Sequence, residues 1–205
     1  MTPPATPRLF GAKHAAILCV IALLIAFAIN ALFNSESLFA IARKGEPPLR
    51  QFWIGALIGT SIASLMLAAF SVGRRYFTAL QALSEQMFAL FTRVDVSGLS
   101  PLLIGITAGL WEEVFFRAAL QPLLGIWWGS LIFMLCHSGT GQFWKMNGKK
   151  AVYALGVFAA GLMLGFIFEK IGLVAAIATH ACIDIIGLFA MRHFQRASFA
   201  TQQDS

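Results

Sequence analysis

Long apolar runs constrain the fold of this chain more than any other feature of its sequence. A helix needs about 20 mainly apolar residues to cross the hydrocarbon core of a bilayer. Segments of this character recur along the chain, the fourth being the shortest: Ala15–Phe33, Phe52–Val72, Leu99–Leu120, Leu123–His137, Val152–Phe168 and Ile171–Met191. We therefore predict an all-α fold, a polytopic transmembrane helical bundle of about six spans.

Composition supports this prediction and excludes a soluble domain. The chain has 205 residues, of which 59% are hydrophobic and only 12% charged, with a mean hydropathy of +0.78. Soluble domains have roughly 45–50% apolar and 25% charged residues. The formal net charge of +6 resides in short basic clusters between apolar runs, as in membrane-protein loops. We expect the lipid bilayer, and no nucleic acid, as a partner.

The basic residues also predict an orientation, because cytoplasmic loops carry an excess of Lys and Arg. With six spans and a cytoplasmic N-terminus, most of the 15 Lys and Arg lie inside: Arg8, Lys13, Arg74, Arg75, Arg93, Lys145, Lys149, Lys150, Arg192 and Arg196. The loop at 43–50 opposes this arrangement mildly. We predict cytoplasmic N- and C-termini in a bacterial inner membrane.

The chain divides into three parts. Residues 1–98 hold two spans and a segment at 77–93, whose apolar residues recur at helical spacing and predict an amphipathic interfacial helix. Residues 99–191 hold the remaining spans. Residues 192–205 form a polar C-terminal tail, which we expect to fray.

The stretch WEEVFFR, residues 111–117, places charges inside an apolar run. A charge at the centre of a bilayer costs a few kcal/mol on insertion scales, so these charges need compensation. Glu113 and Arg117 are four residues apart and therefore share one helix face. Glu112 points about 100° away from Glu113 and has no such local partner.

Two further motifs place ionisable groups inside spans. FMLCH ends in His137, and HACID places His180 four residues before Asp184. At 1.5 Å per residue, Glu112, His137 and His180 all reach the middle to inner part of the membrane. This coincidence predicts a buried polar pocket between the third, fourth and sixth spans.

Such a pocket could activate water for hydrolysis of a peptide bond. A carboxylate in an apolar site can act as a general base, and a histidine can orient the water. A second histidine can donate to the developing oxyanion, and Asp184 could hold His180 in one tautomer. Two histidines and a glutamate would also suit zinc. The chain lacks HExxH and the ligands come from separate helices, so we expect no cofactor, with a divalent metal such as zinc as the alternative.

These motifs carry a family resemblance. EEVFFR fits EExxxR, FMLCH fits FxxxH and HACID fits HxxxN/D. Their order and placement, from about Leu99 to Met191, resemble the CAAX-protease and bacteriocin-processing family, also called Abi, of intramembrane glutamic endopeptidases. Members of this family have also been described as metalloproteases.

The resemblance implies that residues 99–191 form the catalytic core, and it implies a role for each residue of the predicted site. Glu112 would activate the catalytic water with help from His137. His180 and Asp184 would stabilise the oxyanion. Glu113 and Arg117 would hold the structure and charge balance, with Glu113 also assisting catalysis.

The resemblance is weakest at Asp184, where well-studied eukaryotic members have asparagine. An ionised aspartate cannot donate a hydrogen bond to an oxyanion. Asp184 must therefore be protonated, or it acts only through His180.

We therefore expect an endopeptidase that cleaves a membrane-anchored protein or a peptide precursor. The alternative is a non-catalytic membrane protein, such as a bacteriocin-immunity factor or a partner-binding pseudoprotease. A proton-coupled transporter would also need buried carboxylates, but the sequence shows neither the inverted repeats nor the paired broken helices of such proteins.

Overall fold

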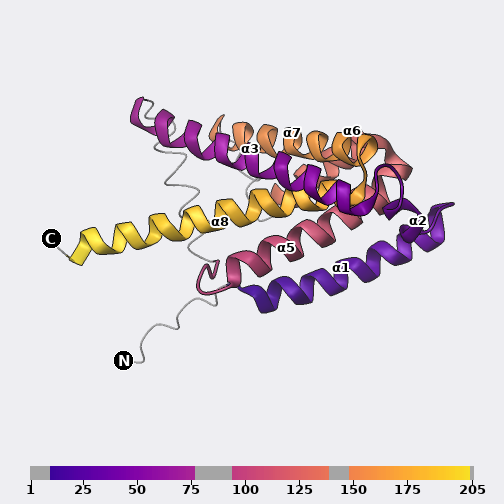
Figure 1. Ribbon diagram of the computed structural model, residues 1–205, viewed down its shortest axis with the longest axis horizontal. Coiled ribbons are helices and arrows are strands. Elements are labelled where there is room, and N and C mark those ends of the chain that lie inside the picture. Colours follow the sequence, from indigo (N-terminus) through magenta and orange to yellow (C-terminus); the bar gives the residue numbers. More distant parts are fainter. Residues whose placement is uncertain (1–9, 77–93, 139–147, 204–205) are drawn as a thin grey trace.

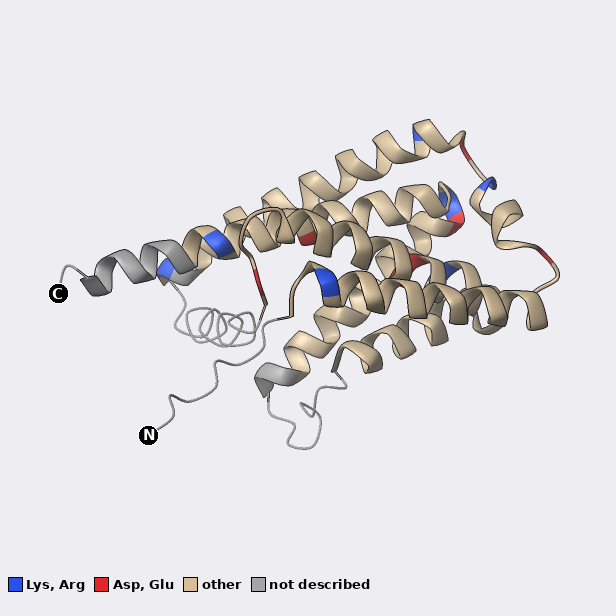
Figure 2. Ribbon diagram, turned by 90° about the horizontal axis from the view of Figure 1, so that it is seen from below, with Lys and Arg blue, Asp and Glu red and all other residues tan. Residues whose placement is uncertain are grey.

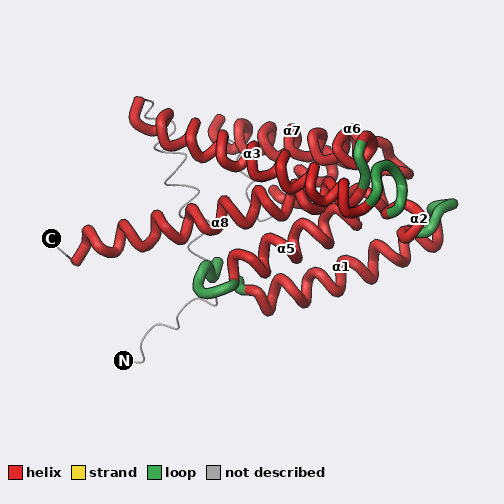
Figure 3. The backbone as a smooth tube through the Cα atoms, in the orientation of Figure 1, coloured by secondary structure: helices red, strands yellow, loops and turns green. Residues whose placement is uncertain are grey.

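The computed structural model describes residues 10–76, 94–138 and 148–203, and these residues are almost entirely helical (Figures 1 and 3). The elements are α1 (Ala12–Phe33), α2 (Leu38–Ala42), α3 (Pro48–Tyr76), α5 (Ser100–Glu113), the π-helical segment η1 (Val114–Leu120), α6 (Gln121–Ser138), α7 (Gly148–Lys170) and α8 (Leu173–Gln203). The predicted polytopic α-helical bundle is confirmed. The predicted interfacial helix at 77–93 lies outside the described residues.

Five helical stretches in the described ranges are long and apolar enough to cross a membrane, and one of them is a hairpin. This stretch, Ser100–His137, reverses at Gly125, whose φ of 77° lies in the left-handed region that favours glycine. The reversal brings Glu112 to His137 and the ring of Phe116 to that of Phe133. The hairpin therefore supplies two antiparallel spans, as the sequence predicted.

Successive long helices run in opposite directions, so the bundle has two distinct ends (Figure 1). At one end, the Asp95 amide donates to the Phe10 carbonyl at 2.9 Å, and Arg192 donates to the Gly98 carbonyl at 3.1 Å. At the other end, the Asn34 side chain donates to the Ala119 carbonyl at 3.1 Å. Figure 2 shows long uncharged stretches along the helices between these ends, as expected for helices that face lipid.

Close helix packing depends on glycine pairs spaced four residues apart, a spacing that lets membrane helices approach closely. Such pairs occur in α3, α5 and α7: Gly55 and Gly59, Gly105 and Gly109, and Gly161 and Gly165. The α3 pair abuts Ala175 and Thr179 of α8, and the Thr179 hydroxyl donates to the Gly55 carbonyl at 3.0 Å. The α5 pair abuts Ala181 of the same helix. Helix α8 therefore lies between α3 and α5 at short range.

A buried glutamine ties α3 to the start of α8. Gln51 is fully buried, and its Nε2 donates to the carbonyls of Lys44 and Glu46 at 2.9 and 2.6 Å. Its Oε1 accepts from the Val174 amide at 3.0 Å. Gly172, at φ 135°, leaves room for this side chain, because a Cβ there would overlap it. These bonds fix where α8 begins.

The C-terminal residues differ from the expectation of a frayed tail. Helix α8 continues to Gln203, whereas its candidate membrane span ends at Phe194, so the helix extends beyond the span. Alanine, arginine and glutamine favour helix, and no glycine or proline follows Gly187. A polar sequence therefore continues the helix beyond the apolar run.

Candidate active site

The paired glutamates lie where α5 passes into the π-helical segment η1. Glu112 is 7% exposed, whereas Glu113 and Arg117 are fully buried. Arg117 Nε donates to Glu113 Oε2 at 3.0 Å, as their spacing predicted. Wide helical turns of this kind occur frequently at functional sites.

Helix α8 brings His180 to these glutamates because Gly109, one turn before Glu113, lets Ala181 approach. The His180 Nδ1 atom lies 2.8 Å from Glu113 Oε1. Glu113 is paired with Arg117 and accepts hydrogen bonds as a carboxylate, so Nδ1 is the donor. His180 Nε2 consequently faces Glu112 Oε2 at 3.9 Å and Asp184 Oδ2 at 3.5 Å.

The second histidine reaches Glu112 from the far arm of the hairpin. His137 Nδ1 lies 2.9 Å from the Phe133 carbonyl oxygen, which can only accept, so Nδ1 carries a proton. His137 Nε2 lies 3.2 Å from Glu112 Oε2. That oxygen is buried and has no well-aligned hydrogen-bond donor among the described residues. Glu112 Oε2 thus keeps capacity to accept a proton or a hydrogen bond.

The charges of this cluster balance only with additional protons. Three carboxylates, those of Glu112, Glu113 and Asp184, face the single guanidinium of Arg117. Buried charges are costly unless they are paired. Two protons shared among the histidines and carboxylates would make the cluster neutral. The site can therefore hold and move protons.

Phe133 packs against several members of the cluster at once. It is 3% exposed, and its ring centroid lies 4.2 Å from that of His137 and 6.2 Å from that of His180. The Arg117 guanidinium carbon lies 4.9 Å from the ring centroid, within cation–π range. This aromatic contact restricts the orientation of His137 and Arg117.

The structure brings all the predicted site residues together: Glu112, Glu113, Arg117, His137, His180 and Asp184. One expectation differs in detail. Glu113, rather than Asp184, contacts His180 Nδ1, and Asp184 lies beside Nε2 with 34% of its side chain exposed. Glu113 reaches the histidine from a neighbouring helix, and a sequence pattern does not predict such a contact.

A metal ion does not fit the described residues. Two histidines approach Glu112, but no group of three or more His, Cys, Asp or Glu side chains among residues 10–76, 94–138 and 148–203 is arranged to hold a metal.

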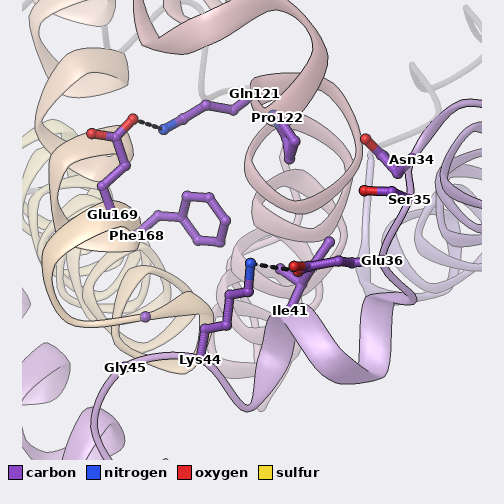
Figure 4. Close-up of a pocket in the computed structure, with 11 residues that line it drawn as sticks. Asn34, Ser35, Glu36, Ile41, Lys44, Gly45, Gln121, Pro122, Phe168 and Glu169 are labelled. Atoms are coloured by element: carbon purple, nitrogen blue, oxygen red, sulfur yellow. Dashed lines mark hydrogen bonds and ion pairs between the residues drawn. The ribbon is translucent and has the colours of Figure 1, made fainter.

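A separate pocket of about 390 Å³ lies at the other end of the bundle (Figure 4). Gln121, Glu169 and Phe168 line it on one side, and Lys44 pairs with Glu36 on the other. The Gln121 amide donates to Glu169 Oε1 at 2.9 Å. None of the predicted site residues lines this pocket, so it is distinct from the carboxylate–histidine cluster.

The fold and the cluster together define a class: a polytopic helical membrane protein with a carboxylate–histidine site inside its bundle. Within this class, residues 96–186 match the family model described as type II CAAX prenyl endopeptidase, Rce1-like. The matched region is therefore similar to the CAAX-protease and bacteriocin-processing family, and the match supports an intramembrane protease role. No curated protein and no solved structure matches the chain.

Proposed function

We propose that this protein hydrolyses a peptide bond in a membrane-associated protein or peptide precursor, using water activated by Glu112 and His137. The position of the Glu112 Oε2 atom is the observation that best supports this proposal. This buried oxygen lies 3.2 Å from His137 Nε2 and 3.9 Å from His180 Nε2, with acceptor capacity unused among the described residues. A general base requires an acceptor of this kind.

The reaction begins when Glu112 accepts a proton from a water molecule. The resulting hydroxide forms a bond to the carbonyl carbon of the scissile peptide, and the carbonyl oxygen becomes negatively charged. His137 keeps its Nε2 atom directed at Glu112, because its Nδ1 proton is held by the Phe133 carbonyl. This arrangement lets the pair share the proton taken from water.

His180 stabilises the oxyanion in the second half of the reaction. Its Nδ1 proton is held by Glu113, so its doubly protonated form presents an Nε2 donor to the reacting centre. Arg117 keeps Glu113 ionised and fixed. The proton taken by Glu112 then passes to the peptide nitrogen, the carbon–nitrogen bond breaks, and Glu112 returns to its carboxylate form.

The proposal includes a location and a kind of substrate. The protein resides in a bacterial inner membrane with both termini in the cytoplasm and acts without a metal or other cofactor. Bacteria generally lack protein prenylation, so the substrate is a small peptide or the tail of a membrane-anchored protein.

The test compares terminal peptides from membranes and secreted material of native cells that carry wild-type protein or Glu112→Gln. The glutamine keeps the size of the side chain and removes the base. We expect one precursor to accumulate uncut in the variant. Glu169→Gln is the matched control, because Glu169 is an exposed carboxylate at the opposite end of the bundle, and it should cleave normally.

Protein levels of all variants are first matched by immunoblot, because a change at a buried residue can unfold the bundle. Unaltered termini at matched levels, in cells where deletion still has a phenotype, would refute proteolysis. They would leave a binding role, such as that of an immunity factor.

A further inference from the structure

Helix α7 supplies none of the predicted site residues, yet its packing brings its first turns to the site. A Cβ at Gly161 would meet Ser130 at 3.1 Å and Phe133 at 3.4 Å. The rings of Phe158 and Trp127 lie 6.4 Å apart. Since α6 and α7 are antiparallel, the residues before Phe158 lie beside the last turn of α6. This register places Tyr153 at the level of His137.

The face of α7 that carries Tyr153 is the buried one. Leu164 and Ile167 are 3% and 8% exposed, and Ile167 packs with Ala175 of α8. Steps of three and four residues back along α7 lead from Ile167 through Leu164 to Tyr153, so these residues share one face. Val152, next to Tyr153, is 64% exposed. Tyr153 itself is partly buried and lies on the side of α8.

The packing register places the Tyr153 phenol on the side of the site carboxylates. Both Asp184 and Glu112 lie within electrostatic range of the Tyr153 phenol. The packing register and this electrostatic proximity agree. Tyr153 therefore belongs to the environment of the reacting centre.

The site is rich in hydrogen-bond acceptors and poor in hydrogen-bond donors. Ionised Glu112 and Asp184 only accept hydrogen bonds, whereas a phenol can donate one. Hydrolysis creates negative charge on the carbonyl oxygen close to these carboxylates. Preorganised donors at that oxygen provide a large share of catalysis in such reactions, and His180 Nε2 supplies at most one of them.

We propose that Tyr153 is a further catalytic residue, whose hydroxyl donates a hydrogen bond to the carbonyl oxygen of the scissile peptide. It acts together with the Nε2–H group of His180 and takes the donor role that ionised Asp184 cannot perform. This inference rests on the proposed peptide hydrolysis. It adds a residue from α7 to a site otherwise built from α5, η1, α6 and α8.

The experiment measures cleavage of the tagged precursor that accumulates in Glu112→Gln cells, using full-length enzyme in proteoliposomes. Tyr153→Phe removes only the hydroxyl. We expect kcat to fall by about 10²–10³-fold, the usual loss for one oxyanion donor, with KM changed by less than about threefold. The chain has two tyrosines, and Tyr76→Phe is the matched control because Tyr76 is 76% exposed at the end of α3.

A kcat for Tyr153→Phe within twofold of wild type overturns the inference. If Glu112→Gln still abolishes cleavage in that case, the proposed function stands and only the role of Tyr153 fails. If no precursor accumulates in Glu112→Gln cells, both fail.

A second measurement separates hydrogen bonding from packing. Incorporating 3,5-difluorotyrosine at position 153 retains the ring and the hydroxyl but makes the hydroxyl a stronger acid. A donor to the oxyanion predicts a kcat that differs from wild type, whereas a packing residue predicts the same kcat.

Discussion

At the scale of single residues, each histidine of the site has one nitrogen fixed and the other directed at Glu112. The Phe133 carbonyl holds His137, and Glu113 holds His180. Arg117 in turn holds Glu113 through Nε. A change at Arg117 should therefore affect both the stability of the bundle and the orientation of His180.

Arg117→Met tests this dependence. Removing one partner of a buried ion pair costs about 3–5 kcal/mol, because the remaining charge stays buried and uncompensated. We expect a large drop in the thermal unfolding midpoint in detergent, together with loss of cleavage. Neutralising the orphaned carboxylate in the double variant Arg117→Met/Glu113→Gln should recover part of the stability.

Arg50→Met is the control for this change. Arg50 forms the same kind of pair with Glu46, at 2.9 Å and four residues apart, but both side chains are exposed. Exposed ion pairs contribute about 0–1 kcal/mol to stability. The thermal unfolding midpoint of Arg50→Met should therefore change little. Equal shifts for the two variants would contradict the buried-pair interpretation.

The candidate residues could be selected from the sequence because charges inside apolar runs are conspicuous. Glu112, His137 and His180 stood out for this reason. The pairing of Glu113 with His180 could not be foreseen, because it depends on how α8 is rotated against α5. Tyr153 gave no signal, since a tyrosine near the end of an apolar helix is common in membrane proteins.

At the scale of elements, the glycine pairs decide how closely α8 approaches its neighbours. A Cβ on Gly109 would lie 2.9 Å from the Ala181 amide and 3.0 Å from the Ile177 carbonyl oxygen. The adjacent His180 depends on this approach for its contact with Glu113. Bulk at Gly109 should therefore separate α5 from α8 and open the site.

Gly109→Leu should lower stability by about 1–3 kcal/mol through overpacking and reduce cleavage more than tenfold. Gly156→Leu is the matched control, because Gly156 also lies within a helix but a Cβ there meets nothing within 4 Å. Unfolding midpoints and cleavage rates of both variants are compared in the same detergent. A Gly109 variant as active as the Gly156 variant would show that the helix approach is not critical.

Element positions were largely predictable, but packing detail was not. Runs of apolar residues predicted every long helix, and the break before Leu123 anticipated the reversal at Gly125. The wide turns of η1 have no counterpart in the residue pattern. The glycine pairs were a readable signal in the sequence, and the spacing of Gly105 and Gly109 would have predicted the face of α5 on which another helix packs.

At the scale of the whole molecule, the two ends of the bundle carry different parts of the chain. The ends of α1 and α8 that lead to the termini lie on the same side of the bundle (Figure 1). Loops with Lys44 and Lys170 lie on the other side. The distribution of Lys and Arg predicts which side faces the cytoplasm.

Reporter fusions test this orientation. Alkaline phosphatase fused after the C-terminus should be inactive, because this enzyme is active only outside the cytoplasm. Green fluorescent protein fused at the same place should fluoresce, because it is fluorescent in the cytoplasm. The control is a pair of fusions truncated after Lys44, which follow one span and should give the opposite result. Active phosphatase at the C-terminus would invert the predicted topology.

The two arms of the hairpin end at different heights. Helix α6 ends at Ser138, one residue beyond the histidine that faces Glu112, whereas α5 continues for 12 residues from Glu112 back to Ser100. At 1.5 Å per residue this difference is about 18 Å. An extended polypeptide spans that distance with about five residues, so the site sets a minimum reach for any chain that arrives from this end. Under the proposed hydrolysis, a substrate tail that enters from this end would need at least this length to place its scissile bond beside Glu112.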